Sequence, residues 1–81
     1  MGLGVEDLSP RARILLALYK GYGSAEEIAR VTGLGLTTVY TYLRIFREAR
    51  VLGKHGDKYV LTEKGSEEAK KIMEELRRIV C

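Results

Sequence analysis

The chain has 81 residues, of which 46% are hydrophobic and 31% charged, and its formal net charge is +3. This length fits one domain, the apolar content predicts a globular fold, and no apolar run reaches the roughly 18 residues that span a bilayer. With no recognisable secretory signal, we expect a single domain over residues 1–81, located in the cytoplasm and not associated with a membrane.

The basic residues are concentrated in the middle of the chain. Residues 30–58 contain six Lys or Arg and two Asp or Glu side chains, whereas the segments on either side are close to neutral. A local basic excess favours an anionic partner. The chain also lacks Asn and Gln but is rich in Lys, Arg and Glu. This composition is typical of hyperthermophile proteins. The alternative explanation is chance together with the preference of helices for Glu and Lys.

The first predicted helix begins at Ser9 and Pro10, because Ser is a strong N-cap and Pro suits the first helical position. The helix is expected to run from Arg11 to Tyr19. Helical spacing places three apolar residues on one side of it, which we expect to face the core: Ile14, Leu15 and Leu18. Leu16 and Tyr19 widen the apolar arc, so we expect this helix to be covered on two sides.

A Gly-Tyr-Gly sequence at residues 21–23 ends the first helix, and a capping box starts the second. In this motif the Ser24 hydroxyl and the Glu27 carboxylate bind exposed backbone N–H groups. The second helix is expected to end near Val31, at a stop signal formed by residues 32–33. Its buried face is predicted to consist of Ala25, Ile28 and Ala29.

A third helix is predicted from Leu36 to Arg50, after a tight connection at residues 33–35. One face is apolar and is expected to lie in the core: Val39, Tyr42, Leu43, Phe46 and Ala49. The opposite face is expected to be exposed: Thr37, Tyr40, Thr41, Arg44 and Glu48, with Leu36 and Arg47 at its margin. Ile45 falls between the two faces and is not explained by a single core.

Beyond Arg50 the hydrophobic period changes from 3.6 to 2, which predicts strands. Two strands are expected at residues 51–54 and 58–61, joined as a hairpin by residues 55–57. Thr62 then caps a helix from Glu63 to about Val80. Its apolar stripe has helical spacing and consists of Ala69, Ile72, Met73, Leu76, Ile79 and Val80.

These elements and their residues resemble the winged helix-turn-helix fold. The sequences IARVTGL (residues 28–34) and TTVYTYL (residues 37–43) resemble the core of archaeal and bacterial winged helix-turn-helix regulators. The sequence YVLTEKG (residues 59–65) resembles the strand-to-helix exit of their MarR-like and PadR-like branches. The resemblance covers about residues 13–76. It implies an α+β, mainly α fold with a three-helix core, a β-hairpin wing and a C-terminal helix.

The resemblance implies a small transcription regulator that binds double-stranded DNA sequence-specifically, as a repressor that occludes a promoter. The third helix would contact base edges through Leu36, Thr37, Thr38, Tyr40, Thr41 and Arg44. Ser24, Arg30 and Arg47 are assigned to the DNA backbone, and Lys54, His55 and Lys58 to the wing contacts. Many relatives carry Ser where Gly35 stands and a basic residue where Leu36 stands, so the exposed face here is unusually apolar and rich in hydroxyl groups.

A protein-interaction module and an enzyme are the alternatives to DNA binding. The apolar character of Leu36 and Tyr40 favours a protein-interaction module in a transcription or replication complex, whereas the basic wing favours DNA. An enzyme has no support in the sequence, because the paired glutamates lie at adjacent helical positions and diverge. No cofactor, metal site or small-molecule effector is predicted. His55, the single histidine, is expected at the tip of the turn.

The C-terminal helix is longer than a wing requires, and its apolar stripe is wider than one small core needs. The stripe either packs back on the first helix or pairs with a second copy of the chain. We predict a homodimer, because two copies double the phosphate contacts, with an interface formed by Ile72, Met73, Leu76, Ile79 and Val80. Cys81 is the single cysteine, so it is either a free thiol or half of a disulfide between two chains.

Overall fold

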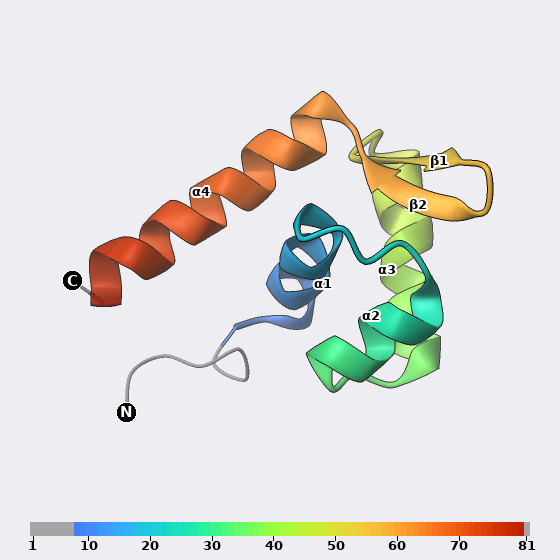
Figure 1. Cartoon of the computed structure of the whole chain (residues 1–81), viewed down its shortest axis with the longest axis horizontal. Coiled ribbons are helices and arrows are strands. Elements are labelled where there is room, and N and C mark those ends of the chain that lie inside the picture. The colour runs from blue at the N-terminus through green and yellow to red at the C-terminus, as the bar shows by residue number, and fades with distance from the viewer. Residues whose placement is uncertain (1–7, 81) are drawn as a thin grey trace.

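A computed structural model describes residues 8–80, and for residues 78–80 it describes the backbone alone. The elements are, in order, α1 (Pro10–Tyr19), α2 (Ala25–Thr32), α3 (Leu36–Glu48), β1 (Leu52–His55), β2 (Lys58–Leu61) and α4 (Glu63–Val80). The strands form one antiparallel hairpin. Figure 1 shows α1, α2 and α3 grouped together, with the hairpin beside α3 and α4 running along α1. The predicted winged-helix architecture, mainly α, is therefore confirmed.

The starts of α1 and α2 follow the capping chemistry that the sequence predicts. The Ser9 hydroxyl accepts a hydrogen bond from the Ala12 N–H at 3.2 Å, and Pro10 occupies the first turn. The Ser24 hydroxyl accepts one from the Glu27 N–H at 3.1 Å. Gly33, with a φ of 75°, ends α2 in the left-handed conformation that favours glycine. These signals place α2 and α3 on either side of a tight turn.

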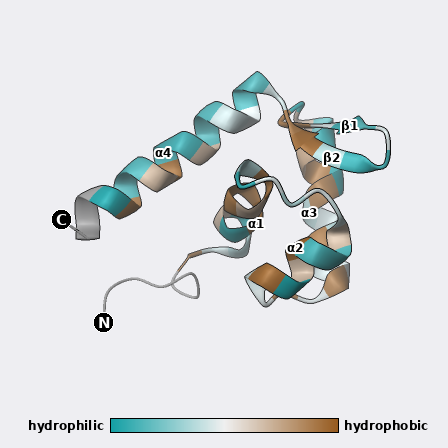
Figure 2. Ribbon diagram, in the orientation of Figure 1, coloured by the Kyte–Doolittle hydropathy of each residue, from teal (hydrophilic) through white to brown (hydrophobic). Residues whose placement is uncertain are grey.

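The core lies where α1, α2 and α3 meet the base of the hairpin. Its largest buried side chains come from all three helices: Ile14, Leu15, Ile28, Val39, Leu43 and Phe46. Figure 2 shows hydrophobic residues on both α1 and α3, while most of α4 is hydrophilic. Burial of these side chains is the main stabilising contribution, and it fixes which face of α3 points outward.

The end of α3 differs from the prediction. The helix stops at Glu48 rather than Arg50, because Arg50 has a φ of 62° and the Val51 N–H donates to the Phe46 carbonyl at 2.9 Å. This left-handed residue turns the chain back, so that Val51 is buried. Ala49 was expected in the core, but it is exposed. The prediction for Ala49 was wrong because α3 ends at Glu48, so Ala49 does not follow the spacing of the buried face.

The second strand lies at residues 58–61 as predicted, but the first strand is shifted by one residue. The first strand covers residues 52–55 instead of 51–54, and the register pairs Leu52 with Leu61 and His55 with Lys58. His55 therefore ends a strand, and the turn consists of Gly56 and Asp57 alone. The φ of Gly56 is 66°, which lets two residues close the hairpin with the twist of its strands.

The start of α4 is held tightly against the chain that leaves α3. The Thr62 hydroxyl donates to the Arg50 carbonyl at 2.7 Å and accepts from the Gly65 N–H at 3.2 Å, so its predicted cap is confirmed. The Thr62 N–H donates to the Val51 carbonyl at 3.0 Å. A β-carbon at Gly65 would overlap that same carbonyl oxygen. This junction sets the direction of α4 and the base of the wing relative to α3.

The first half of α4 packs on α1. Ala69 is fully buried, Ile72 packs against the core, and Arg11 of α1 forms an ion pair with Glu68. Ile72 was assigned to a dimer interface, but at least part of its side chain is covered within the same chain. None of the helices in the described residues has both the length and the apolar character needed to cross a membrane.

Candidate nucleic-acid interface

The outer face of α3, formed by Leu36, Thr37, Tyr40, Thr41 and Arg44, is exposed along its whole length. Leu36 is 41% exposed and Tyr40 is 51% exposed, and the other three side chains are exposed as well. Thr38 is half-buried and lies toward the side of the helix. The opposite face holds Val39 and Phe46 in the core. The predicted division of α3 into a buried and an exposed face is thus confirmed.

The first turn of α3 offers free backbone donors. Gly35 is the N-cap and provides no side-chain hydrogen bond to the helix. A β-carbon added at Gly35 would meet no atom within 4 Å other than those of its chain neighbours. The initial N–H groups of a helix lack internal partners and carry the positive end of its dipole. This end of α3 can therefore approach an oxygen-rich anion closely.

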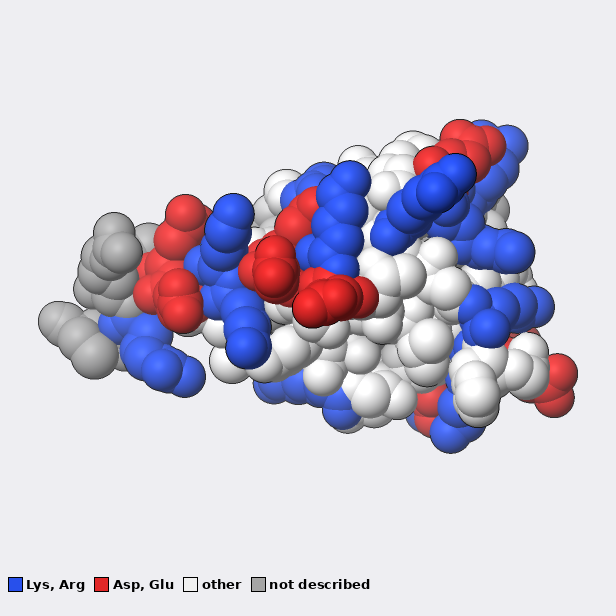
Figure 3. All heavy atoms as spheres, turned by 90° about the horizontal axis from the view of Figure 1, so that it is seen from above, with Lys and Arg blue, Asp and Glu red and all other residues white. Residues whose placement is uncertain are grey.

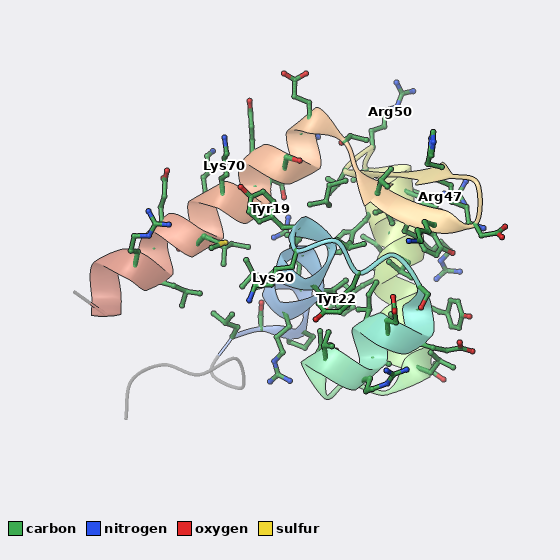
Figure 4. All side chains as sticks on the ribbon, viewed as in Figure 1. Tyr19, Lys20, Tyr22, Arg47, Arg50 and Lys70 are labelled. Carbon is green, nitrogen blue, oxygen red and sulfur yellow. The ribbon has the colours of Figure 1, made fainter. Side chains whose placement is uncertain are left out.

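A hollow of about 440 Å³ lies between α3 and the wing. It is lined by the side chains of Tyr40, Leu43, Arg44, Arg47, Glu48 and Tyr59. Figure 4 shows Arg47 beside the hairpin and Arg50 projecting outward from its base. The guanidinium groups of Arg44 and Arg47 share this concave surface with two tyrosines. We call it the α3–wing hollow. Tyr59 was not among the predicted site residues; the hairpin register sets it opposite Lys54.

The wing is anchored to the rest of the fold through β2. The Tyr59 N–H donates to the Gly23 carbonyl at 2.9 Å, and a β-carbon at Gly23 would come within 3.0 Å of the Lys58 β-carbon. The Lys54 ammonium lies over the Tyr59 ring, 5.2 Å from its centroid, in a cation–π contact. Lys54, His55 and Lys58 are all exposed. The predicted wing residues thus share one ribbon whose position relative to α3 is fixed.

The charge of the molecule is unevenly distributed. Figure 3 shows Lys and Arg alternating with Asp and Glu along α4, whereas the end formed by α3 and the wing is mainly basic. That end carries Arg44, Arg47, Lys54 and Lys58, with Glu48 and Asp57 as its acidic residues. Four of the six basic residues of the middle segment therefore lie on α3 and the wing, whereas Arg30 lies on α2 and Arg50 follows the end of α3.

Two of the predicted backbone contacts lie outside the α3–wing hollow. Ser24 is half-buried, and its hydroxyl is used to cap α2. Arg30 is exposed on α2 but does not line the hollow. Among the described residues, no group of three or more His, Cys, Asp or Glu side chains is arranged to hold a metal ion.

The residues predicted for dimerisation lie along the second half of α4. Met73 and Leu76 are half-buried. Met73 also lines a second hollow of about 220 Å³ between α1 and α4, with Tyr19, Lys70, Glu74 and Arg77, and Figure 4 shows Tyr19 and Lys70 near one another there. The side chains of Ile79 and Val80, and all of Cys81, lie outside the described residues. The dimer interface therefore stays a prediction.

Comparison with known proteins identifies the same fold. A family model described as "Winged helix-turn helix" matches residues 11–60. A MarR family protein of Mycobacterium tuberculosis has a solved structure with 25% sequence identity and a TM-score of 0.74, covering 91% of this chain and 58% of that chain. No curated protein matches the chain.

Two further solved structures have a similar fold. One is a complex of a Mycobacterium tuberculosis MarR family protein with DNA, with 24% identity and a TM-score of 0.76, covering 93% of this chain and 60% of that chain. The other is a MarR/EmrR family transcriptional regulator from Acinetobacter sp. ADP1, with 19% identity and a TM-score of 0.72, covering 90% and 56%. The chain thus spans less than two thirds of the length of each of these three structures.

Proposed function

The chain belongs to the winged helix-turn-helix family, and we propose that it binds double-stranded DNA. In this proposal α3 lies in the major groove, which is wide enough for one helix, and the wing follows the phosphates beside it. The observation that carries the proposal is the exposed outer face of α3 next to a basic wing, on a helix whose other face is locked in the core. The solved complex of a MarR family protein with DNA supports it.

The side chains divide into two kinds of contact. Arg44 is the one basic residue on the outer face of α3, so we assign it to a guanine, which an arginine can bind through two hydrogen bonds. Arg47, Lys54 and Lys58 are assigned to phosphates, which fix position and add affinity without selecting a sequence. The uncapped start of α3 suits a further phosphate oxygen.

We further propose that the protein is a transcription regulator that represses by occlusion. A domain seated in the major groove excludes other proteins from the same base pairs, so binding within a promoter is sufficient to block transcription. The MarR family names of the similar structures support a regulatory role. The location of the protein follows from this role, and we expect it in the cytoplasm with the genome.

An electrophoretic shift with mixed genomic fragments tests DNA binding. We expect a shift at about 50 mM salt and a large loss of affinity by about 200 mM, because each neutralised phosphate releases counterions. The second candidate, a protein-interaction module, is favoured by the exposure of Leu36 and Tyr40. It predicts no shift at any salt concentration, so the same experiment separates the two functions.

Removal of either wing lysine should weaken binding without changing its specificity. We expect Lys54→Ala and Lys58→Ala each to reduce affinity for all sequences alike, and to flatten the dependence of log affinity on log salt by about one unit. Fluorescence anisotropy with two unrelated duplexes across a salt series measures both effects. Lys71→Ala, on the exposed surface of α4, is the control and should leave the slope unchanged. An unchanged slope in both wing variants would show that the wing does not contact phosphates.

We propose that the protein acts as a homodimer through the second half of α4. Met73 and Leu76 are only half-buried within one chain, and two copies would bind two half-sites of a symmetric operator. Sedimentation equilibrium should give about twice the 9.1 kDa mass of one chain. Leu76→Glu should shift the mass toward that of the monomer, because a buried carboxylate at the interface is unfavourable. A wild-type monomer at high micromolar concentration would exclude the dimer.

A further inference from the structure

The outer face of α3 carries no charged side chain over its first two turns. Its exposed residues there are Leu36, Thr37, Tyr40 and Thr41, and the first charge on this face is Arg44. Leu36 and Tyr40 are four residues apart, so they lie one above the other on the helix. A helix in the major groove contacts base edges mainly through its N-terminal turns. In the proposed complex, the residues that reach the bases first are therefore apolar groups and hydroxyls.

This face has few hydrogen-bond donors for base recognition. The Thr41 hydroxyl donates to the Thr37 carbonyl at 2.9 Å, so its proton is used within the helix and its methyl group remains for contact. Leu36 has no polar group in its side chain. The chain also contains no Asn and no Gln, the two residues that bind adenine through paired hydrogen bonds. An A·T pair therefore meets here the single hydroxyls of Thr37 and Tyr40 and the apolar groups of this face, and no side chain that forms paired hydrogen bonds with adenine.

We propose that the first two turns of α3 recognise A·T pairs through the C5 methyl groups of thymine. Thymine is the one base with a methyl group in the major groove, and apolar side chains contact it. Leu36 and Tyr40 would be the main contacts, with the Thr41 methyl beside them. At about 1.5 Å per residue, Arg44 follows Leu36 by about 12 Å along α3, so the two side chains reach different base pairs. The preferred half-site then has thymines at one end and a guanine at the other. This inference rests on the proposed function.

Replacement of thymine by uracil tests the inference, because uracil lacks only the methyl group. A duplex is first enriched from a random-sequence pool by binding to the protein, and is then made with deoxyuridine at every thymine position. We expect affinity to fall about fourfold for each contacted thymine, as for one methyl group removed from an apolar contact. The salt dependence should stay the same, since the phosphates are unchanged.

Two variants locate the effect on α3. Leu36→Ala and Tyr40→Ala should each bring the affinity ratio of the thymine to the uracil duplex closer to one. Both side chains are exposed, so the fold should be retained, which circular dichroism checks. Val31→Ala is the matched control, because Val31 is 43% exposed but lies on α2 beside α1. It should keep the wild-type ratio.

The outcomes separate this inference from the proposed function. Equal affinity of the wild-type protein for both duplexes, with a steep salt dependence, would overturn thymine recognition and leave DNA binding intact. A preference for thymine that survives in both α3 variants would also overturn it, because its source would then lie in the duplex or elsewhere on the protein. If neither duplex binds at low salt, the proposed function is wrong and this inference is wrong with it.

Discussion

Replacement of Gly65 by alanine is expected to lower the free energy of unfolding by about 3 kcal/mol. The added β-carbon would overlap the Val51 carbonyl oxygen and would lie 2.9 Å from the Leu61 Cδ2 atom. The carbonyl cannot move away cheaply, because it already accepts the Thr62 N–H and belongs to the turn that follows Arg50. Thermal unfolding should show a melting temperature lower by about 10–20 °C.

Gly53→Ala is the matched control for this prediction. Gly53 lies in β1, close to the same junction, but a β-carbon there would meet nothing within 4 Å and its φ is not positive. We expect its free energy of unfolding to change by less than about 1 kcal/mol. If Gly65→Ala unfolds at the same temperature as Gly53→Ala, the close approach of α4 to the chain at Val51 is not a feature of the folded protein.

Replacement of Arg44 by alanine should have the largest effect on sequence recognition. We expect affinity for a selected operator to fall by about 1–3 kcal/mol, or about fivefold to 150-fold. Affinity for random DNA should fall much less, because Arg44 is assigned to a base and the phosphate contacts remain. Competition binding with both duplexes at one salt concentration measures the difference. Selection with the variant should also give an operator with one degenerate base pair.

Two controls accompany the Arg44 variant. Lys71→Ala removes an exposed cation from α4, outside the residues assigned to DNA or to the dimer interface, and should leave both affinities unchanged. Arg47→Ala removes the neighbouring guanidinium in the α3–wing hollow and should lower both affinities alike, as a phosphate contact does. Equal loss on operator and random DNA in Arg44→Ala would show that Arg44 binds the backbone and does not read a base.

Much of the fold could be predicted because its signals are local. The caps at Ser9 and Ser24 act within four residues, and the glycine at position 33 ends α2 through its own φ. The apolar spacing of α3 also depends on one helix alone. Such signals need no knowledge of distant contacts, and they position the outer face of α3, which is the main part of the candidate site.

The errors arose where backbone geometry or long-range contacts decide the structure. The end of α3 depends on a left-handed arginine at position 50, which the residue type does not signal as glycine does. The requirement for glycine at position 65 comes from the Val51 carbonyl, fourteen residues earlier in the chain. Tyr59 enters the α3–wing hollow through the hairpin register, which a one-residue shift of the first strand obscured.

The central claim is that DNA lies against the outer face of α3 and the wing. Titration of isotope-labelled protein with a short duplex at low salt, followed by amide chemical shifts in NMR, tests it most directly. The largest changes are expected in residues 35–45 and 54–59, with little change in the part of α4 between residues 66 and 77. Changes confined to α1 and α4, or no changes at all at low salt, would contradict the claim.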